Sequence, residues 1–368
     1  MYKIYVFFLM TYLTGSSAMA HNDTPITQDT PSNKQTQSYS SENQLEQNTL
    51  SKFEPFWAKG HFSSFQGIKN IRINYATFRH NTDEQSNNCL IIVPGRGESY
   101  IKYQEFAYDI YNEGYDLFII DHRGQGLSER SLENTHKGYV EKFQYYVEDL
   151  SAFVNDIVLP SCQEKPFMLA HSMGGAIATT YLQQNPNIVK AAVLAAPMLA
   201  IPSHGLPYFL AKIIVSIGQF LEQLFTDTSW YFLGQENFKQ DTFEENQLMH
   251  SKARYKKFSE LYINNPTVQL GGVTFQWVYE SLNAIEDIFS NAHQLKTPVI
   301  VLQGSEDTIV DISGQDRFCN ALNQVNAKVC PNAVPITFEG AYHELFFEKD
   351  NIRNKAISTS LAWFDSHR

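Results

Sequence analysis

The sequence has few cysteines and no cluster of basic residues, and both absences narrow the class of protein. Lysine and arginine total 28 against 39 aspartate and glutamate residues, which gives a formal net charge of −11. Nucleic acids and anionic lipids both attract basic patches, so we expect no nucleic-acid partner and no electrostatic docking on anionic lipid. The four cysteines and 11 histidines show no metal-ligand spacing. We therefore expect no metal and no other cofactor.

The four cysteines allow three disulfide pairings, and the sequence alone does not choose among them. Cys319 and Cys330 are the nearest pair along the chain. A bridge between these two residues is the first expectation, because export would place the chain where disulfides form. Four buried free thiols are the alternative.

The N-terminus lacks a hydrophobic run long enough to span a bilayer, which needs about 20 apolar residues. It has a shorter run instead, from Ile4 to Leu13, which follows Lys3 and precedes the small residues of Ala18-Met19-Ala20. This order is typical of a secretory signal peptide, here residues 1–20. We expect an exported protein, periplasmic or secreted, and an uncleaved membrane-surface anchor is the alternative.

The next segment, residues 21–50, is rich in Gln, Ser, Thr and Asn and poor in apolar side chains. Such a segment buries too little surface to offset its ordering entropy, so we expect a disordered tether with no catalytic role. The remaining residues, 51–368, are numerous enough for one large core with an inserted cap, since 43% of the chain is hydrophobic.

Short apolar runs alternate with helix-length segments through the rest of the chain. This alternation predicts an α/β fold, with a mostly parallel, doubly wound sheet covered on both faces. Functional residues then belong at the carboxyl ends of the strands. The expected strands are residues 71–78, 89–93, 115–120, 167–171, 191–196, 298–302 and 334–338, and expected helices include 100–112, 139–158 and 356–364.

The most specific motif is Phe167-Met168-Leu169-Ala170-His171-Ser172-Met173-Gly174-Gly175. A buried strand that enters a turn of small residues around a serine, followed by an apolar helix, is typical of the nucleophile elbow of α/β-hydrolases. Ala170 stands where glycine is more usual, and alanine still fits the turn. We therefore predict that Ser172 is a catalytic nucleophile.

Two further residues complete a predicted triad with Ser172. The order of nucleophile, acid and histidine along an α/β-hydrolase chain is met by Ser172, Asp307 and His343, and each follows an expected strand. His343 would act as the general base and Asp307 would orient it. Glu306 and Asp311 are the alternatives for the acid, because they lie in the same loop as Asp307.

Backbone amides are expected to stabilise the oxyanion. One is that of Met173, directly after the nucleophile, and the other is that of Arg96 in the segment Pro94-Gly95-Arg96-Gly97-Glu98. This assignment leaves the Arg96 side chain for another role, and a plain tight turn is the alternative. Residues 121–128 are expected to brace this loop, with a second catalytic centre as the alternative.

The interval from about residue 198 to 295 lacks a buried-strand pattern and is expected to form a helical cap over the nucleophile. Within it, an apolar stripe has helical spacing. The stripe either packs on the rest of the cap, or lines an acyl-chain channel or touches a membrane surface transiently. Its members are Phe209, Leu210, Ile213, Ile214, Ile217, Phe220, Leu221, Leu224 and Phe225.

Four segments carry a resemblance to a known family: residues 94–100, 120–126, 169–175 and 340–344. They resemble monoacylglycerol lipases, and still more the bacterial lysophospholipases related to them, which also keep alanine at the position of Ala170. The resemblance extends into the cap and covers roughly residues 55–368.

The resemblance implies the α/β-hydrolase fold with an inserted helical cap. It also implies hydrolysis of the acyl ester of a lysophospholipid through an acyl-enzyme, which releases a fatty acid and a glycerophosphodiester. The exported start departs from relatives that act at the inner membrane. The alternatives are a monoacylglycerol lipase or another carboxylesterase, a serine aminopeptidase, or a non-catalytic lipid-binding protein.

Overall fold

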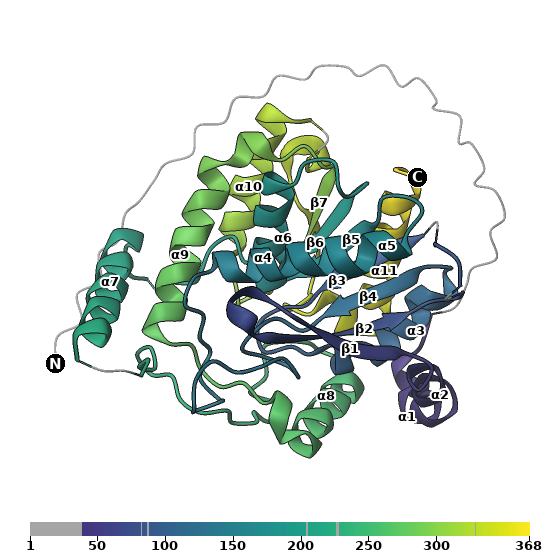
Figure 1. The fold of residues 1–368 in the computed structure, drawn as a ribbon, viewed down its shortest axis with the longest axis horizontal. Coiled ribbons are helices and arrows are strands. Elements are labelled where there is room, and N and C mark those ends of the chain that lie inside the picture. Colours follow the sequence, from purple (N-terminus) through teal and green to yellow (C-terminus); the bar gives the residue numbers. More distant parts are fainter. Residues whose placement is uncertain (1–38, 82, 87, 204, 226–227, 328) are drawn as a thin grey trace, which may run out of the picture. The chain divides into compact units, whose positions relative to one another are not determined.

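An eight-stranded sheet forms the centre of the protein (Figure 1). The computed structural model describes residues 39–368 except residues 82, 87, 204, 226–227 and 328, so the expected signal peptide lies outside the described residues. The strand order is β1-β2-β4-β3-β5-β6-β7-β8, and every pair from β4 to β8 is parallel. The strands are β1 (His61–Gln66), β2 (Arg72–Phe78), β3 (Cys89–Val93), β4 (Asp116–Ile120), β5 (Phe167–His171), β6 (Ala192–Ala195), β7 (Val299–Gly304) and β8 (Ile336–Phe338).

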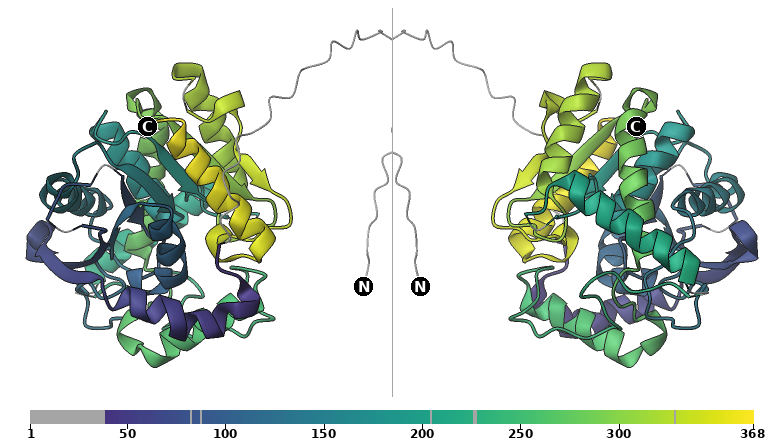
Figure 2. Two further views of the ribbon diagram at one scale, coloured as in Figure 1. Left: turned by 90° about the vertical axis from the view of Figure 1, so that its right-hand side faces the viewer. Right: turned by 90° about the vertical axis from the view of Figure 1, so that its left-hand side faces the viewer.

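Helices cover both faces of the sheet (Figures 1 and 2). Successive residues of a strand point to opposite faces, so Leu90 and Ile92 of β3 pack with α3 and α11, while Ile91 and Val93 pack with α4, α6, α9 and α10. The expected doubly wound α/β class is confirmed. The helices are α1 (Leu45–Asn48), α2 (Glu54–Trp57), α3 (Gln104–Asn112), α4 (Gln144–Phe153), α5 (Leu159–Ser161), α6 (Met173–Gln184), α7 (Tyr208–Phe225), α8 (Lys252–Asn264), α9 (Phe275–Ser290), α10 (Ile312–Val325) and α11 (Asp350–Asp365).

The edge strand β1 was not predicted from the sequence. It pairs only with β2, antiparallel, and most of its side chains are exposed or half-buried. Its residues are mainly polar because an edge strand of this kind buries little surface, so the apolar run that identified the other seven strands is missing.

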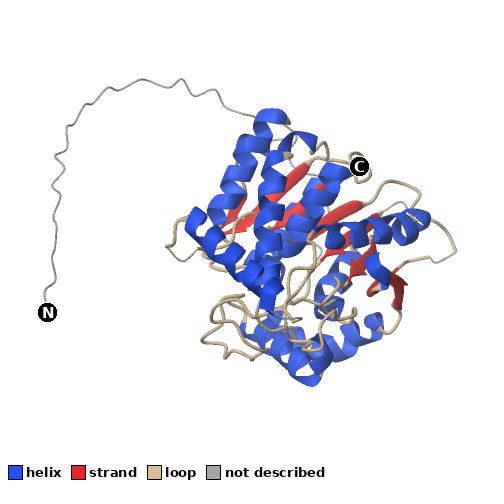
Figure 3. Ribbon diagram, turned by 60° about the vertical axis from the view of Figure 1, so that its left-hand side comes forward, coloured by secondary structure: helices blue, strands red, loops and turns tan. Residues whose placement is uncertain are grey.

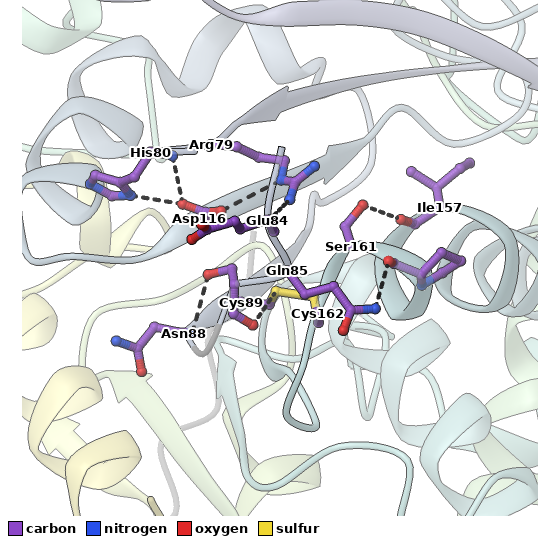
Figure 4. Close-up of a disulfide and its surroundings, with 12 residues drawn as sticks. Arg79, His80, Glu84, Gln85, Asn88, Cys89, Asp116, Ile157, Ser161 and Cys162 are labelled. Carbon is purple, nitrogen blue, oxygen red and sulfur yellow. Dashed lines mark hydrogen bonds and ion pairs between the residues drawn. A yellow bond between two sulfur atoms is a disulfide. The ribbon is translucent and has the colours of Figure 1, made fainter. Parts of the chain in front are cut away.

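The described residues form two disulfides, one of which connects a strand of the sheet to a segment beside it. Cys319 and Cys330 pair as expected, and the alternative of free thiols is wrong because Cys89 and Cys162 also pair. Figure 4 shows the second bridge, between the start of β3 and the residue after α5. Close by, the Asp116 carboxylate accepts a hydrogen bond from the backbone N–H of His80 at 2.9 Å.

The end of the expected tether is ordered, which corrects its predicted boundary at residue 50. Leu45 and Phe53 are buried, and the Ser40 hydroxyl donates a hydrogen bond to Asp109 at 2.7 Å. The Ser251 hydroxyl, directly before α8, donates to Glu42 at 2.6 Å. The polar composition was misleading because these polar side chains find buried partners in the hydrolase domain.

The interval from residue 198 to 295 contains α7, α8 and α9. Figure 1 shows α7 at the left edge of the domain, and in the right-hand view of Figure 2 this helix crosses the front. Figure 3 shows the same fold coloured by secondary structure. Its buried residues are Val215, Gln219 and Glu222, whereas all nine residues of the apolar stripe are exposed. The expectation that the stripe packs on the rest of the cap is therefore wrong.

Candidate active site

Ser172 occupies the sharp turn between β5 and α6. Its φ of +51° is rare for a residue other than glycine, and such strain concentrates at functional sites. The two residues after Met173 must be small. A Cβ on Gly174 would lie 2.3 Å from the Val93 carbonyl oxygen, and one on Gly175 would lie 2.6 Å from the Pro197 side chain. The glycine pair therefore lets α6 start close behind β3.

Asp307 and His343 are joined directly at the ends of β7 and β8. His343 Nδ1 lies 2.7 Å from Asp307 Oδ2, and both side chains are buried. The other carboxylate oxygen of Asp307 accepts the backbone N–H groups of Ile309 and Val310, which fixes its orientation.

The two alternative acids lie elsewhere. Glu306 is 3.7 Å from His250 and largely exposed, and Asp311 caps the N-terminus of α10. Of the three carboxylates in this loop, Asp307 is the one hydrogen-bonded to His343.

His171, the residue before Ser172, connects the elbow to the histidine. Its Nε2 lies 3.3 Å from the His343 backbone oxygen, and the two imidazole rings are 4.7 Å apart. Gly95 approaches the same point, since a Cβ built on it would lie 3.0 Å from the Ser172 Cβ. The structure thus gathers the elbow, the Asp307–His343 pair and the loop after β3 at one edge of the sheet.

A buried network of charged side chains contacts this site through His171. Its members are Glu98, Lys102, His171 and Glu344. Lys102 Nζ is 2.5 Å from a carboxylate oxygen of Glu98 and 2.5 Å from one of Glu344. The other oxygen of Glu98 accepts from Tyr103 at 2.8 Å and lies 3.1 Å from His171 Nδ1. Every member is largely shielded from solvent.

The charges in this network determine the pKa values of its members. Burial opposes ionisation of Glu98, but Lys102 and His171 outweigh it and hold the pKa of Glu98 well below its usual value. Burial likewise lowers the pKa of His171, but the carboxylates of Glu98 and Glu344 outweigh it and leave that pKa raised.

Three members of the network, Glu98, His171 and Glu344, have ligand atoms close enough together to hold a metal ion. The Lys102 ammonium already lies between the two carboxylates and supplies the positive charge they require. The geometry therefore favours an internal ion-pair network at this point.

The loop after β3 is held from two sides. The Gly95 amide donates to Glu98, and Gln125 Nε2 donates to the Gly95 carbonyl at 2.7 Å and to the Glu98 carbonyl at 3.0 Å. The Asp121 carboxylate accepts from the Ser99 hydroxyl at 2.8 Å. The predicted bracing role of residues 121–128 is confirmed, and these contacts fix the backbone around Arg96.

Met173 begins α6, so its amide is among the first N–H groups of a helix, which have no partner within the helix. Arg96 stands beside Gly95, and its side chain runs to the cap, where Nη2 donates to the Gly271 carbonyl and the guanidinium lies 5.5 Å from the Trp277 ring. Burial lowers the pKa of Arg96 to about 10.

Sequence reasoning missed the charged network around Glu98. The positions of these residues in the sequence were the signal that could have identified them. Glu98 ends the loop after β3, Lys102 follows four residues later, and Glu344 and His171 each adjoin a predicted triad member.

Comparison with known proteins identifies the protein family and supports the fold. Residues 84–350 match the family described as serine aminopeptidase, S33. Solved structures agree in fold. A soluble variant of monoglyceride lipase from Saccharomyces cerevisiae aligns with a TM-score of 0.61 at 20% identity, over 84% of this chain and 97% of that one.

Similarity to curated relatives identifies the branch of the family to which the chain belongs. Lysophospholipase L2 of Escherichia coli strain K12 is 38% identical over 87% of this chain and 92% of its own length. A probable lysophospholipase L2 of Haemophilus influenzae is 31% identical over 84% of this chain and 94% of its own. Monoglyceride lipase of Rattus norvegicus is 26% identical over 76% and 82%. The chain belongs to the monoacylglycerol lipase-like α/β-hydrolases, in the bacterial lysophospholipase branch that its motifs predicted.

Proposed function

We propose that this protein is a serine hydrolase that cleaves the acyl ester of lysophospholipids to a fatty acid and a glycerophosphodiester. The observation that carries the proposal is the 2.7 Å contact between His343 and Asp307. The backbone oxygen of His343 also lies 3.3 Å from His171 Nε2, and His171 directly precedes Ser172 in the strained elbow. The similarity to lysophospholipase L2 supports the substrate class.

The proposed mechanism uses this geometry. Asp307 accepts a hydrogen bond from the Nδ1–H of His343, which leaves Nε2 unprotonated as the base for the Ser172 hydroxyl. Ser172 Oγ attacks the acyl carbonyl, and the amides of Arg96 and Met173 stabilise the oxyanion. His343 returns the proton to the departing glycerol oxygen, and an acyl-enzyme remains. Water activated by His343 then releases the fatty acid.

The test is substitution of the nucleophile. Ser172→Ala should lower kcat toward a lysophospholipid by roughly 10⁴-fold or more, since catalysis depends on the covalent step. A fluorophosphonate probe should label the wild-type protein and leave the variant unlabelled. Near-normal hydrolysis by the variant would contradict the mechanism, and an unlabelled, inactive wild type would favour a non-catalytic lipid-binding protein.

A substrate panel ranks the other activities. Lysophosphatidylcholine, a monoacylglycerol and an aminoacyl anilide represent lysophospholipase, monoacylglycerol lipase and aminopeptidase activity. An aminopeptidase needs a carboxylate for the free amine of its substrate, and Glu98 and Glu344 are already paired with Lys102. We therefore expect no turnover of the anilide.

The exposed face of α7 supports a transient contact with a membrane surface. Among the described residues, α7 is the helix long and apolar enough to cross a membrane by length and composition. Its polar side is held by the protein, because Gln219 bonds Gln276 at 3.0 Å and Glu222 bonds the Ser229 hydroxyl at 2.7 Å. An apolar outer face on a helix anchored by its polar face suits a helix lying in the membrane interface.

This contact is tested by vesicle sedimentation. Ile213→Asp with Ile217→Asp should reduce binding to neutral phosphatidylcholine vesicles. Val334→Asp, at an exposed apolar residue before β8, is the matched control and should bind as the wild type does. Equal binding by all three proteins would contradict the membrane role of α7.

Export to the periplasm or the medium is also proposed. The signal-like residues 1–20 and two disulfides support it, because disulfides persist in oxidising compartments. Cell fractionation with N-terminal sequencing tests this location. A cytoplasmic protein that keeps Met1 would contradict it.

A further inference from the structure

The side chain of Arg96 is a half-buried cation without an acidic partner among the described residues. Three arginines that are fully buried have such a partner. Arg123 pairs with Asp149 at 2.6 Å, Arg254 with Glu105 at 2.9 Å, and Arg353 with Asp109 at 2.7 Å. Arg96 bonds a backbone carbonyl through Nη2, its Nε has no hydrogen-bond partner, and it makes no salt bridge within residues 39–368 as the structure describes them.

A half-buried charge without a counterion is unfavourable, because the ion has lost part of its hydration without gaining an opposite charge. The guanidinium nevertheless keeps its proton at neutral pH, since its lowered pKa of about 10 is still well above 7. The fold also makes room for it, because a Cβ on Gly138 would lie 2.6 Å from Arg96 Nη2. Such a group has the properties of a binding site for an anion supplied by the substrate.

The position of Arg96 connects this charge to the reacting ester. Its neighbour Gly95 lies against Ser172, and its own amide is the proposed oxyanion donor. In a lysophospholipid, a glycerol backbone separates the ester carbonyl from the phosphate. An arginine side chain spans a comparable length from its own amide, so one residue is able to contact both ends of the polar part of the substrate.

We propose that the Arg96 guanidinium binds the phosphodiester of the lysophospholipid headgroup and makes the enzyme prefer phosphate-bearing lipids to neutral monoacylglycerols. This inference rests on the proposed lysophospholipase function. Arginine suits the role because its planar fork donates charge-assisted hydrogen bonds to phosphate oxygens. Gly271 and Trp277, which belong to the interval 198–295, contact the guanidinium and fix its position.

The test compares 1-palmitoyl lysophosphatidylethanolamine with 1-palmitoylglycerol, each at the same mole fraction in neutral detergent micelles. The readout is the ratio of the two kcat/KM values, so a general effect on catalysis cancels. Arg96→Gln should lower this ratio about ten-fold or more, the range that a charge-assisted hydrogen bond contributes. Arg96→Lys keeps the charge and should restore part of the ratio.

Arg130→Gln is the matched control. Arg130 also bonds backbone carbonyls of a loop and of the cap, at Gly124 and Thr267, so its loss tests for tethering and for general charge effects. The control should leave the ratio within about two-fold of the wild-type value, well below the effect of a charge-assisted hydrogen bond.

Two results would overturn the inference: an unchanged ratio in Arg96→Gln, or an equal fall in Arg130→Gln. A wild-type enzyme without activity on the lysophospholipid would overturn the proposed function as well. If the wild type hydrolyses the lysophospholipid and the ratio of kcat/KM values is the same in all variants, only the proposed contact between Arg96 and phosphate is overturned.

Discussion

Replacing Glu98 by Gln should destabilise the fold, because this carboxylate receives four donors in a buried site. The donors are the Gly95 amide, the Tyr103 hydroxyl, the Lys102 ammonium and the His171 ring. Glutamine has the same shape, so the substitution removes charge while leaving volume unchanged. Loss of one partner from a buried ion pair costs about 3–5 kcal/mol. In this variant Glu344 still neutralises part of the Lys102 charge. We expect a loss near the lower end, about 3 kcal/mol.

The assay is urea unfolding followed by circular dichroism at pH 7, with both disulfides intact. Glu141→Gln is the control, because Glu141 pairs with Lys69 on the exposed surface and should leave the unfolding free energy unchanged within error. Equal stability of the Glu98 and Glu141 variants would show that the buried network contributes nothing net, and the reasoning would fail.

Acid should remove the difference between the wild type and the Glu98→Gln variant. A carboxylate whose pKa is lower in the folded protein binds protons more readily when unfolded, so its stabilisation is present above the ordinary pKa and is lost as the pH falls toward the lowered one. The contribution of His171 to stability changes with pH in the opposite direction. Its raised pKa stabilises the fold most fully below its usual value near 6.5, and this contribution is lost as the pH rises through the raised pKa.

Two further predictions concern the triad and the disulfides. Asp307→Asn should lower kcat by about 10⁴-fold with little change in the fold, because the amide holds His343 in the wrong tautomer; a loss below about ten-fold would argue against Asp307 as the orienting acid. Replacing Cys89 and Cys162 together by Ser should lower the unfolding free energy by about 4 kcal/mol, since the bridge closes a loop of 73 residues. Mass spectrometry after alkylation should find four added groups with reduction and none without it, and any group without it would contradict two bridges.

Much of the fold was predictable because strands that contribute apolar side chains to the core leave apolar runs in the sequence. Seven strands and the elbow at Ser172 followed from such runs. The edge strand β1 did not, because a strand that is mostly exposed has no such pattern. The orientation of α7 was also unpredictable. Helical spacing shows that one face is apolar, but it does not say whether that face meets the protein or its surroundings.

The site shows the same limit. Chain order and strand ends predict a triad of Ser172, Asp307 and His343, and the structure joins the last two directly. The network of Glu98, Lys102, His171 and Glu344 was not predictable, because it depends on side chains from three separate segments meeting in space. Local sequence cannot show that a carboxylate is buried beside a lysine.

The hydrogen bonds of Ser40 and Glu42 have a consequence for how the protein matures. The described contacts of the hydrolase domain begin just after residue 38, and the predicted leader cleavage after Ala20 lies well before them. Leader removal would therefore leave every described tertiary contact in place. A shift of the predicted cleavage position by several residues would likewise leave all of these described contacts intact.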